Sequence, residues 1–369
     1  MKYDYLIVGA GVFGCTFAHE VTKHGYKCLV IDQRNHLGGN TYCLDINGIP
    51  IHNYGAHIFH TNSELLWKYV NQFTRFEPFV NSPLAMRNNR LYNLPFNMNT
   101  FYQIWGIADP EKARQQIISE LTDYINPINL EQQSTNLVGT TLYNLIIKGY
   151  TQKQWGRPCT ELPPFIIKRL PIRYTFNNNY FNDYYQGIPE QGYNPMIQGM
   201  LKDIPYELGT PYTKGHDYNC KKIVYTGSLD EYFEYCYGVL QYRSLEFEHH
   251  ETYTKNHQGT PVINYGDVQI PYTRSIEHKH FYRQFTNNSS VVSKEFPIEW
   301  SLGKERYYPI NDTNNQVLFL KYTQLADKET NVIFGGRLAE YHYYDMHQVI
   351  ASALKAAHKE TNTRYEMQY

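Results

Sequence analysis

The feature that most constrains this chain is a glycine-rich turn directly after its first apolar run. Residues 5–8 read YLIV and predict a β-strand, and residues 9–14 read GAGVFG and lead into a helix-compatible run. In such a turn Gly9 allows a tight bend, Gly11 lets the backbone approach a pyrophosphate, and Gly14 lets the helix pack closely on its strand. The helix N-terminus adds N–H groups and a positive dipole end. The turn therefore predicts a dinucleotide-binding unit.

The residues after the second predicted strand indicate which dinucleotide is bound. Residues 27–31 form an apolar run that ends in Asp32, an acid placed to accept the hydroxyls of a ribose. Arg34, Gly39 and Asn40 follow in a double-glycine segment. Acid, base and double glycine in this order are typical of FAD proteins and unusual in nicotinamide dehydrogenases. The sequence therefore predicts FAD, and a glycine-rich turn of another α/β protein is the alternative.

A second part of the cofactor site is predicted near the end of the sequence. Residues 331–334 read as a strand, a glycine pair and Arg337 follow, and Asp345 precedes an apolar helix that starts with Met346. A second helix N-terminus is thus available to the cofactor. The predicted FAD-binding domain is therefore discontinuous and assembled from both ends of the sequence.

Between the two cofactor segments the spacing of apolar residues changes twice. Helical spacing comes first; it includes a helix starting at Pro110 and a helix ending near Tyr150, and a hairpin turning at Asn88 and Asn89 interrupts it. Short β-rich runs follow. The predicted fold class is α/β, with a Rossmann-like FAD-binding domain (1–62 and 301–369), an inserted helical domain (63–164, hairpin near 81–94) and an antiparallel β-sheet domain (165–300, with an FAD-domain segment near 193–230).

Composition restricts the class of partner. A net charge of −1 and a pI near 6.9 offer no general attraction to nucleic acid or to an anionic membrane, so we expect neither as a partner. The sequence contains no membrane-length apolar run and enters its first strand without a leader, so a cytoplasmic location is expected. We expect no metal, because the six cysteines lack metal-type spacing and no third ligand is evident beside His57 and His60.

Five motifs spread along the chain are more specific than the glycine turn. They read GAHIFHT at 55–61, NLPFN at 93–97, KGYTQKQWG at 148–156, PYTR at 271–274 and GGRLAEY at 335–341. In this order they resemble the bacterial UDP-galactopyranose mutases over nearly the whole chain. The resemblance implies a homodimeric flavoenzyme, active with reduced FAD. It would interconvert UDP-galactopyranose and UDP-galactofuranose without net redox change, as a source of furanose for surface glycans.

The resemblance also implies roles for residues at matching positions. Arg169 and Arg274 would hold the diphosphate, which suits a guanidinium because it presents several fixed donors and stays charged. With His60, near C2 of the sugar, they form the predicted catalytic set. The predicted substrate-binding set is Asn81, Tyr150, Trp155, Arg169, Tyr180, Arg274, Tyr308 and Tyr343. The predicted cofactor-binding set is Gly9, Gly11, Phe13, Gly14, Asp32, Arg34, Gly39, Asn40, His57, Ile58, Arg243, Arg337, Asp345 and Met346.

In the implied mechanism N5 of reduced flavin attacks the anomeric carbon as UDP leaves. The protein then mainly positions the sugar and stabilises the diphosphate. No side-chain acid or base stands out for the ring-opening proton. Three alternatives remain open at this point: a mutase that also accepts UDP-N-acetylgalactosamine, an FAD oxidoreductase of the amine-oxidase type, and a non-catalytic protein that binds nucleotide sugars.

Overall fold

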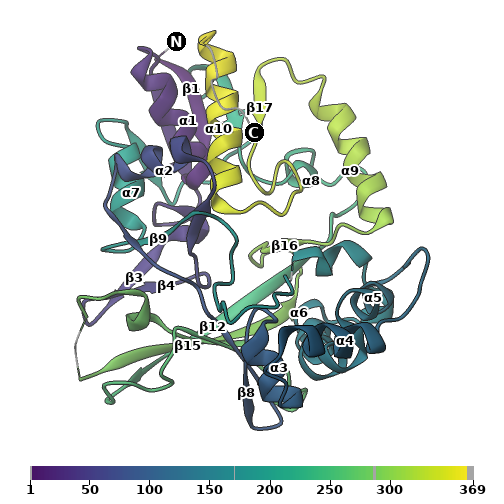
Figure 1. Cartoon of the computed structure of the whole chain (residues 1–369). Helices are drawn as coiled ribbons and strands as arrows, with labels where there is room; N and C mark the ends of the chain where they lie inside the picture. Colours follow the sequence, from purple (N-terminus) through teal and green to yellow (C-terminus); the bar gives the residue numbers. More distant parts are fainter. Residues whose placement is uncertain (1, 170, 286–287, 364–369) are drawn as a thin grey trace. The chain divides into compact units, whose positions relative to one another are not determined.

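The chain divides into two compact units, seen in the computed structural model of Figure 1. The structure describes residues 2–169, 171–285 and 288–363. Unit 1 comprises Met1–Pro78, Asp183–Tyr242 and Arg306–Tyr369, and unit 2 comprises Phe79–Asn182 and Arg243–Glu305. Each unit combines strands and helices, in agreement with the predicted α/β class. Within the described ranges, no helix is both long and apolar enough to cross a membrane.

A five-stranded parallel sheet forms the centre of unit 1. Its order is β10 (Tyr206–Leu208), β2 (Cys28–Asp32), β1 (Tyr3–Val8), β11 (Cys220–Tyr225) and β17 (Val332–Phe334). Tyr5 and Ile7 of β1 pack into a core with the helices on one face, and Leu6 packs near Tyr212 and Tyr218 on the other. Burial on both faces explains why the strand reads as one apolar run.

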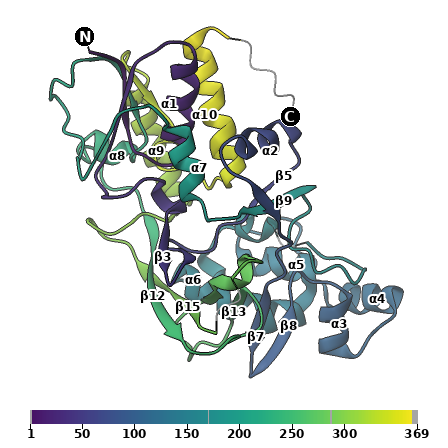
Figure 2. The ribbon, with the colours of Figure 1, turned by 90° about the vertical axis from the view of Figure 1, so that its left-hand side faces the viewer.

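Helices from opposite ends of the sequence cover this sheet together. Helix α1 (Val12–Lys23) lies along α10 (Met346–Thr361) in both Figure 1 and Figure 2, and their side chains share the main core of unit 1. The predicted discontinuous Rossmann-like domain is therefore confirmed. The remaining elements of unit 1 are β3 (Cys43–Ile46), β4 (Ile49–His52), β5 (Phe59–Thr61), α2 (Glu64–Asn71), β6 (Phe76–Pro78), β9 (Tyr185–Pro189), α7 (Asn194–Met200), α8 (Leu229–Tyr232), β16 (Tyr308–Pro309) and α9 (Thr313–Ala326).

Unit 2 joins a mainly antiparallel sheet to a group of helices. The strand order is β12 (Tyr242–Thr252), β15 (Ser290–Glu299), β14 (Arg274–Glu277), β13 (Val262–Tyr265), β7 (Leu84–Arg87) and β8 (Arg90–Asn93). Only β13 and β7 are parallel among these neighbours. The helices are α3 (Met98–Trp105), α4 (Pro110–Glu120), α5 (Leu130–Leu142) and α6 (Lys148–Trp155). Because β7 pairs with β13, the structure groups in one unit the helices and the sheet that the sequence assigned to separate domains.

Two local predictions in unit 2 are confirmed. The hairpin is present as β7 and β8, and its turn residues Asn88 and Asn89 have φ of 52° and 57°, as a two-residue turn with left-handed backbone requires. Helix α4 begins at Pro110, and the Asp109 side chain accepts a hydrogen bond from the Lys112 N–H at 2.8 Å. Proline at the first helical position and an acid at the cap are both typical of helix starts.

The predicted helix end near Tyr150 is wrong. Helix α6 continues to Trp155 and ends at Gly156, which has a left-handed φ of 65°. Gly149 lies inside the helix, where an added Cβ would be 2.1 Å from the Gly266 carbonyl oxygen. This glycine allows close packing of the helix against a neighbouring loop.

His52, at the end of β4, is a neutral histidine built into unit 1. Its side chain is 2% exposed, and its Nδ1 accepts a hydrogen bond from the His57 N–H at 3.0 Å. Burial, together with the charge of nearby His57, lowers the pKa of His52 to about 3. The ring therefore holds the backbone of the 52–57 loop as a neutral acceptor.

We predict that His52 contributes to acid sensitivity. An unfolded chain protonates this residue below about pH 6.5, whereas the folded chain does so only near pH 3, so the unfolded state binds more protons between these values. The free energy of unfolding should fall as pH is lowered through this window, by at most ~1.4 kcal/mol per pH unit. In urea unfolding, the free energy of unfolding of His52→Asn should depend less steeply on pH. Asparagine keeps a hydrogen-bond acceptor, Oδ1, at the position of histidine Nδ1.

The exposed His216 provides the control for this measurement. His216→Asn should retain the wild-type dependence of stability on pH. An unchanged slope in His52→Asn would contradict the role assigned to His52.

Candidate functional site

The glycine turn of unit 1 is a cradle in which backbone segments nearly touch. Gly9 has a φ of +109°, and a Cβ there would lie 1.9 Å from Thr226 Oγ1. A Cβ on Gly14 would lie 2.1 Å from the Gly9 carbonyl oxygen, and one on Gly39 would lie 3.1 Å from Gly11 Cα. Among the described residues no side chain caps the start of α1. The cradle thus presents backbone N–H groups, as a pyrophosphate requires.

Polar residues predicted to bind the cofactor are linked around this cradle. The Asp32 carboxylate accepts hydrogen bonds from the Ala10 N–H at 2.7 Å and from the Arg34 N–H at 2.8 Å. The Arg34 guanidinium donates to Asn40 Oδ1 at 3.0 Å. His57 Nε2 donates to the Asn40 carbonyl oxygen at 2.6 Å. These hydrogen bonds join the segment before the double glycine, which carries Arg34, to the segment after it, which carries Asn40.

The C-terminal cofactor segment meets the same cradle. A Cβ on Gly335 would lie 2.1 Å from Phe13 Cζ, so glycine is needed where β17 ends against α1. Arg337 donates to the Tyr307 carbonyl oxygen at 2.7 Å, and its guanidinium lies 5.6 Å from the centre of the Tyr343 ring. The Tyr343 ring stacks on that of Tyr308 at 5.5 Å.

His60 lies in a polar cluster with the start of α10. Asp345 begins this helix through a capping box with Gln348, and Met346 is its first residue. One donor atom each from His60, Asp345 and His347 lie within 4.8 Å of one another. His57 is not in this group, so the expectation of no metal at His57 and His60 stays a prediction. Three such donors have the chemistry to take up a divalent transition metal ion.

In unit 2, Arg274 lies between an aromatic hydroxyl and a buried acid. Its Nη2 donates to the Tyr150 hydroxyl at 2.8 Å, and its Nη1 lies 3.4 Å from Glu295 Oε2. Strand pairing places Arg274 of β14 directly opposite Glu295 of β15, whose side chain is 0% exposed. The guanidinium is thus fixed from two elements, and its planar set of donors suits a diphosphate.

Helix α6, which carries Tyr150 and Trp155, is held by a partly buried lysine and a buried arginine. Lys153 Nζ donates to the carbonyl oxygens of Ile270 at 3.0 Å and Tyr272 at 2.9 Å, just before β14, and burial lowers the pKa of Lys153 to about 8. Arg243 Nε donates to the Gln154 carbonyl oxygen at 3.0 Å, and burial also lowers the pKa of Arg243. The flavin contact proposed for Arg243 stays a prediction.

The other predicted residues of unit 2 lie around its core. Trp155 and Tyr180 are partly buried and pack against the apolar core of this unit. The Tyr180 N–H donates to the carbonyl oxygen of Asn81, which is 8% exposed. The backbone of Arg169 lies in a short 3₁₀ segment, η4 (Pro164–Arg169), and its side chain lies outside the described residues. The roles of all these residues remain predictions.

The sequence did not indicate the acids that orient the two best-placed functional side chains. Glu295 pairs with Arg274 through strand register. Asp183 pairs with His60 across 123 positions of sequence, with 2.5 Å between Oδ2 and His60 Nδ1. Neither acid belongs to a motif, so only the three-dimensional pairing reveals them. The predicted residue Ile58 precedes β5 and is partly buried beside the His57 loop.

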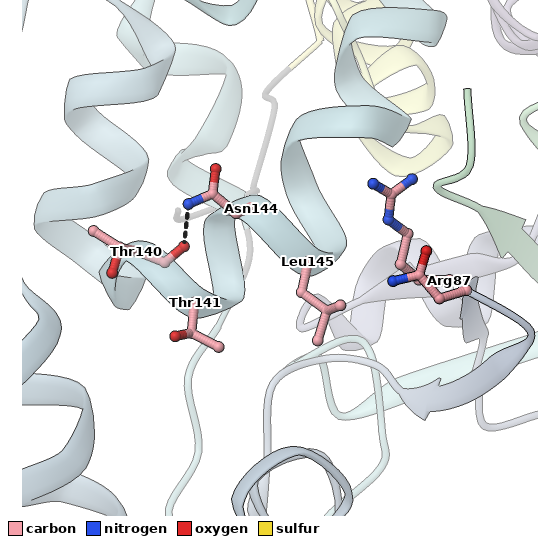
Figure 3. A pocket seen from close by; sticks show the side chains of 6 residues that line it. Arg87, Thr140, Thr141, Asn144 and Leu145 are labelled. Atoms are coloured by element: carbon pink, nitrogen blue, oxygen red, sulfur yellow. Dashed lines mark hydrogen bonds between the residues drawn. The ribbon is translucent and has the colours of Figure 1, made fainter. Parts of the chain in front are cut away.

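A shallow cavity of about 360 Å³ in unit 2 contains none of the predicted site residues (Figure 3). Arg87, Asn88, Thr140, Thr141, Asn144 and Leu145 line it. The Asn144 amide donates to the Thr140 carbonyl oxygen at 2.9 Å. Arg87 already pairs with Asp267 at 3.1 Å, so this cation is not available to bind a diphosphate there.

Comparisons with known proteins agree on one family. A family model described as UDP-galactopyranose mutase matches residues 145–343, and one described as an NAD(P)-binding Rossmann-like domain matches residues 7–73. The chain is 40% identical over 361 residues to a probable UDP-galactopyranose mutase of Klebsiella pneumoniae, covering 96% of this chain and 94% of the relative. It is 37% identical to a dTDP-fucopyranose mutase of Escherichia coli, covering 95% and 97%.

A solved structure of reduced UDP-galactopyranose mutase has the same fold. The TM-score is 0.77 at 14% sequence identity, and the match covers 98% of this chain and 94% of the other. A putrescine oxidase structure matches with a TM-score of 0.60 at 12% identity over 98% of this chain and 99% of the other. These two likenesses show that the fold of this chain is shared with both proteins.

We predict that Arg274 stabilises unit 2 through Glu295. Arg274→Met should lower the free energy of unfolding by about 2–3 kcal/mol, because it leaves a buried carboxylate without its cation; a fully buried pair would lose ~3–5 kcal/mol. The double variant Arg274→Met/Glu295→Gln should recover most of this loss in urea unfolding. Additive losses in the double variant would contradict the pairing.

Proposed function

Because this chain belongs to the UDP-galactopyranose mutase family, we propose that it interconverts UDP-galactopyranose and UDP-galactofuranose. The similarity to a named mutase over 96% of the chain carries this proposal. It is supported by an arginine fixed for anion binding in unit 2 and a dinucleotide cradle in unit 1. The reaction is an isomerisation without net redox change, and the product furanose would be available for surface glycans.

The cofactor we propose is FAD in its reduced form. The cradle fits the group, since Gly9 and Gly14 allow a close backbone approach at which a Cβ would clash, and no described side chain caps the start of α1. Asp32 and Arg34 would bind the adenosine side, and Arg337 and Asp345 would bind from the C-terminal segment. When bound, reduced FAD supplies a nucleophilic nitrogen, N5, to the anomeric carbon.

The task of the protein in this reaction is to hold a leaving group that must return. The bond between C1 and the diphosphate breaks and later forms again, so UDP has to stay in place while the sugar ring opens and closes. Arg274 and Arg169 would hold the diphosphate through their fixed donors. Tyr150 would stack on uracil, with Asn81, Trp155, Tyr180, Tyr308 and Tyr343 lining the substrate.

A second candidate substrate comes from the relative named dTDP-fucopyranose mutase. Its name indicates the same ring contraction on a different nucleotide sugar, so dTDP-fucopyranose is the alternative that a specific observation favours. Acceptance of UDP-N-acetylgalactosamine remains a third possibility. We further propose that the protein is cytoplasmic and forms a homodimer, as expected from the resemblance.

We predict turnover only with reduced flavin. Protein reduced with dithionite should convert UDP-galactofuranose to UDP-galactopyranose over many cycles without consuming reductant, because N5 becomes nucleophilic only on reduction. Chromatography of the nucleotide sugars measures the product, and dTDP-fucofuranose in a parallel reaction decides between the two substrates. Protein loaded with a flavin that carries carbon at position 5 should bind UDP but show no turnover.

Two outcomes of this assay would contradict the proposal. Full activity with the carbon-substituted flavin would exclude the nucleophilic role of N5. Loss of one reducing equivalent per product would place the chain among FAD oxidoreductases of the amine-oxidase type.

We also predict that lysine cannot replace the diphosphate arginines. Arg274→Lys and Arg169→Lys keep the charge but lose the planar fork, so kcat/KM should fall severely while flavin content stays normal. Alanine at either position should cost about 2–5 kcal/mol of transition-state stabilisation. Steady-state kinetics measure both effects. Arg114→Lys, on the partly exposed face of α4, is the matched control and should retain activity.

A further inference from the structure

We propose that Asp183 is a positioning residue that fixes which ring nitrogen of His60 carries a proton. This inference rests on the proposed function, in which His60 belongs to the catalytic set. Asp183 and His60 are both in unit 1, and none of the sequence motifs includes Asp183. The argument depends on a chain of three hydrogen bonds in which each group has only one possible role.

The first hydrogen bond defines the His60 ring. Asp183 Oδ2 lies 2.5 Å from His60 Nδ1, and the two side chains are 21% and 12% exposed. An ionised carboxylate can only accept, so Nδ1 must carry the proton. In the neutral ring, Nε2 then carries no proton and can only accept a hydrogen bond.

The second and third hydrogen bonds define Asp183. Asn62 Nδ2 donates to Asp183 Oδ1 at 2.6 Å, and Asn62 Oδ1 accepts from the Tyr184 N–H at 2.9 Å. A backbone N–H can only donate, so the amide of Asn62 has one orientation and its NH₂ group must face Asp183. The carboxylate is thus held between a fixed donor and the imidazole.

Strand pairing places these groups together. Strand β5 pairs antiparallel with β9, with His60 opposite Gln186 and Thr61 opposite Tyr185. Asp183 lies just before β9, and Gln186 Nε2 donates to its carbonyl oxygen at 2.7 Å. The backbone ladder and Asn62 already join the two strands, so this joint does not need a carboxylate bound to the imidazole ring.

The surroundings of His60 favour a functional reading. The His347 ring lies edge-to-face with the His60 ring at 5.3 Å, and a donor atom of Asp345 lies within 4.8 Å of both. His60 thus faces Asp345, which we assign to the cofactor. A histidine with a fixed tautomer offers one defined acceptor or donor to a substrate hydroxyl, whereas an unsupported ring offers either.

The test exploits the fixed direction of Asn62. In Asp183→Asn the new amide must turn its oxygen toward the NH₂ of Asn62, so its own NH₂ faces His60 Nδ1. The neutral ring then has to accept at Nδ1 and carry its proton on Nε2, the inverse of the wild type. We expect kcat/KM for UDP-galactofuranose to fall by about 10–100-fold, the range for a polar partner left mismatched, with unchanged affinity for UDP alone.

A swap variant should restore the native tautomer. In Asn62→Asp/Asp183→Asn, an acid at position 62 accepts from both the Tyr184 N–H and the amide at 183. That amide then turns its carbonyl oxygen to His60 Nδ1, and the proton returns to this nitrogen. We expect the double variant to recover most of the lost kcat/KM with the total charge of the wild type.

Nitrogen NMR of ¹⁵N-histidine-labelled holoenzyme at alkaline pH reads the tautomer without any activity assay. The Nδ1 and Nε2 shifts of His60 should exchange character in Asp183→Asn and revert in the swap variant. Asp217→Asn is the matched control, because Asp217 accepts from the Asn219 N–H in an exposed loop.

The outcomes separate this inference from the proposed function. Wild-type protein without mutase activity would contradict the function but leave the NMR result decisive for the tautomer. Active wild type with full kcat/KM in Asp183→Asn, or a wild-type His60 tautomer in that variant, would overturn the role of Asp183. If Asp183→Asn lowered the melting temperature but left the kinetics and the His60 tautomer unchanged, Asp183 would serve only to join the two strands. That result would also overturn the proposed positioning role.

Discussion

The close approach of backbone to backbone in the turn after β1 determines the rest of unit 1. A Cβ at Gly14 would lie 2.1 Å from the Gly9 carbonyl oxygen, so only glycine lets α1 lie this near the strand. Helix α1 then supports α10 from the other end of the sequence, and Phe13 meets Gly335 at the end of β17. The cofactor site is therefore lined by backbone, whose N–H groups cannot be removed by substitution.

Unit 2 achieves a comparable rigidity with charge. Arg274 is held by a carboxylate that is 0% exposed and by the Tyr150 hydroxyl, and Lys153 ties the helix that carries Tyr150 to the segment before β14. A buried charge pair of this kind adds little net stability, because desolvation offsets the attraction. Its effect is on geometry, because it fixes the guanidinium donors. In the proposed function, donors fixed before the diphosphate arrives would be the most effective ones.

Local patterns in the sequence predicted the parts of the fold that depend on neighbouring residues. The glycine turn, the hairpin at Asn88 and Asn89 and the start of α4 at Pro110 each follow from backbone preferences over a few positions. The helix predicted to end near Tyr150 instead continues to Trp155, and Gly149 within it lies against Gly266, far away in sequence. Sequence pattern cannot show such contacts.

The same limit applies to the site. The motifs identified Arg274 and His60, but their partners Glu295 and Asp183 depend on strand register, which one sequence leaves undetermined. The pairing of β7 with β13 is likewise a contact between distant parts of the sequence, and it brings the helices and the sheet into one unit.

Two histidines three positions apart carry their protons on opposite nitrogens. His57 Nε2 faces the Asn40 carbonyl oxygen and must donate to it, whereas His60 Nδ1 faces the Asp183 carboxylate and must donate there. Backbone fixes the first ring and a carboxylate fixes the second. An isomerisation that re-forms the bond to the same nucleotide consumes no net proton or electron. In the proposed function, the protein would contribute by holding this pattern of donors and acceptors before the sugar binds.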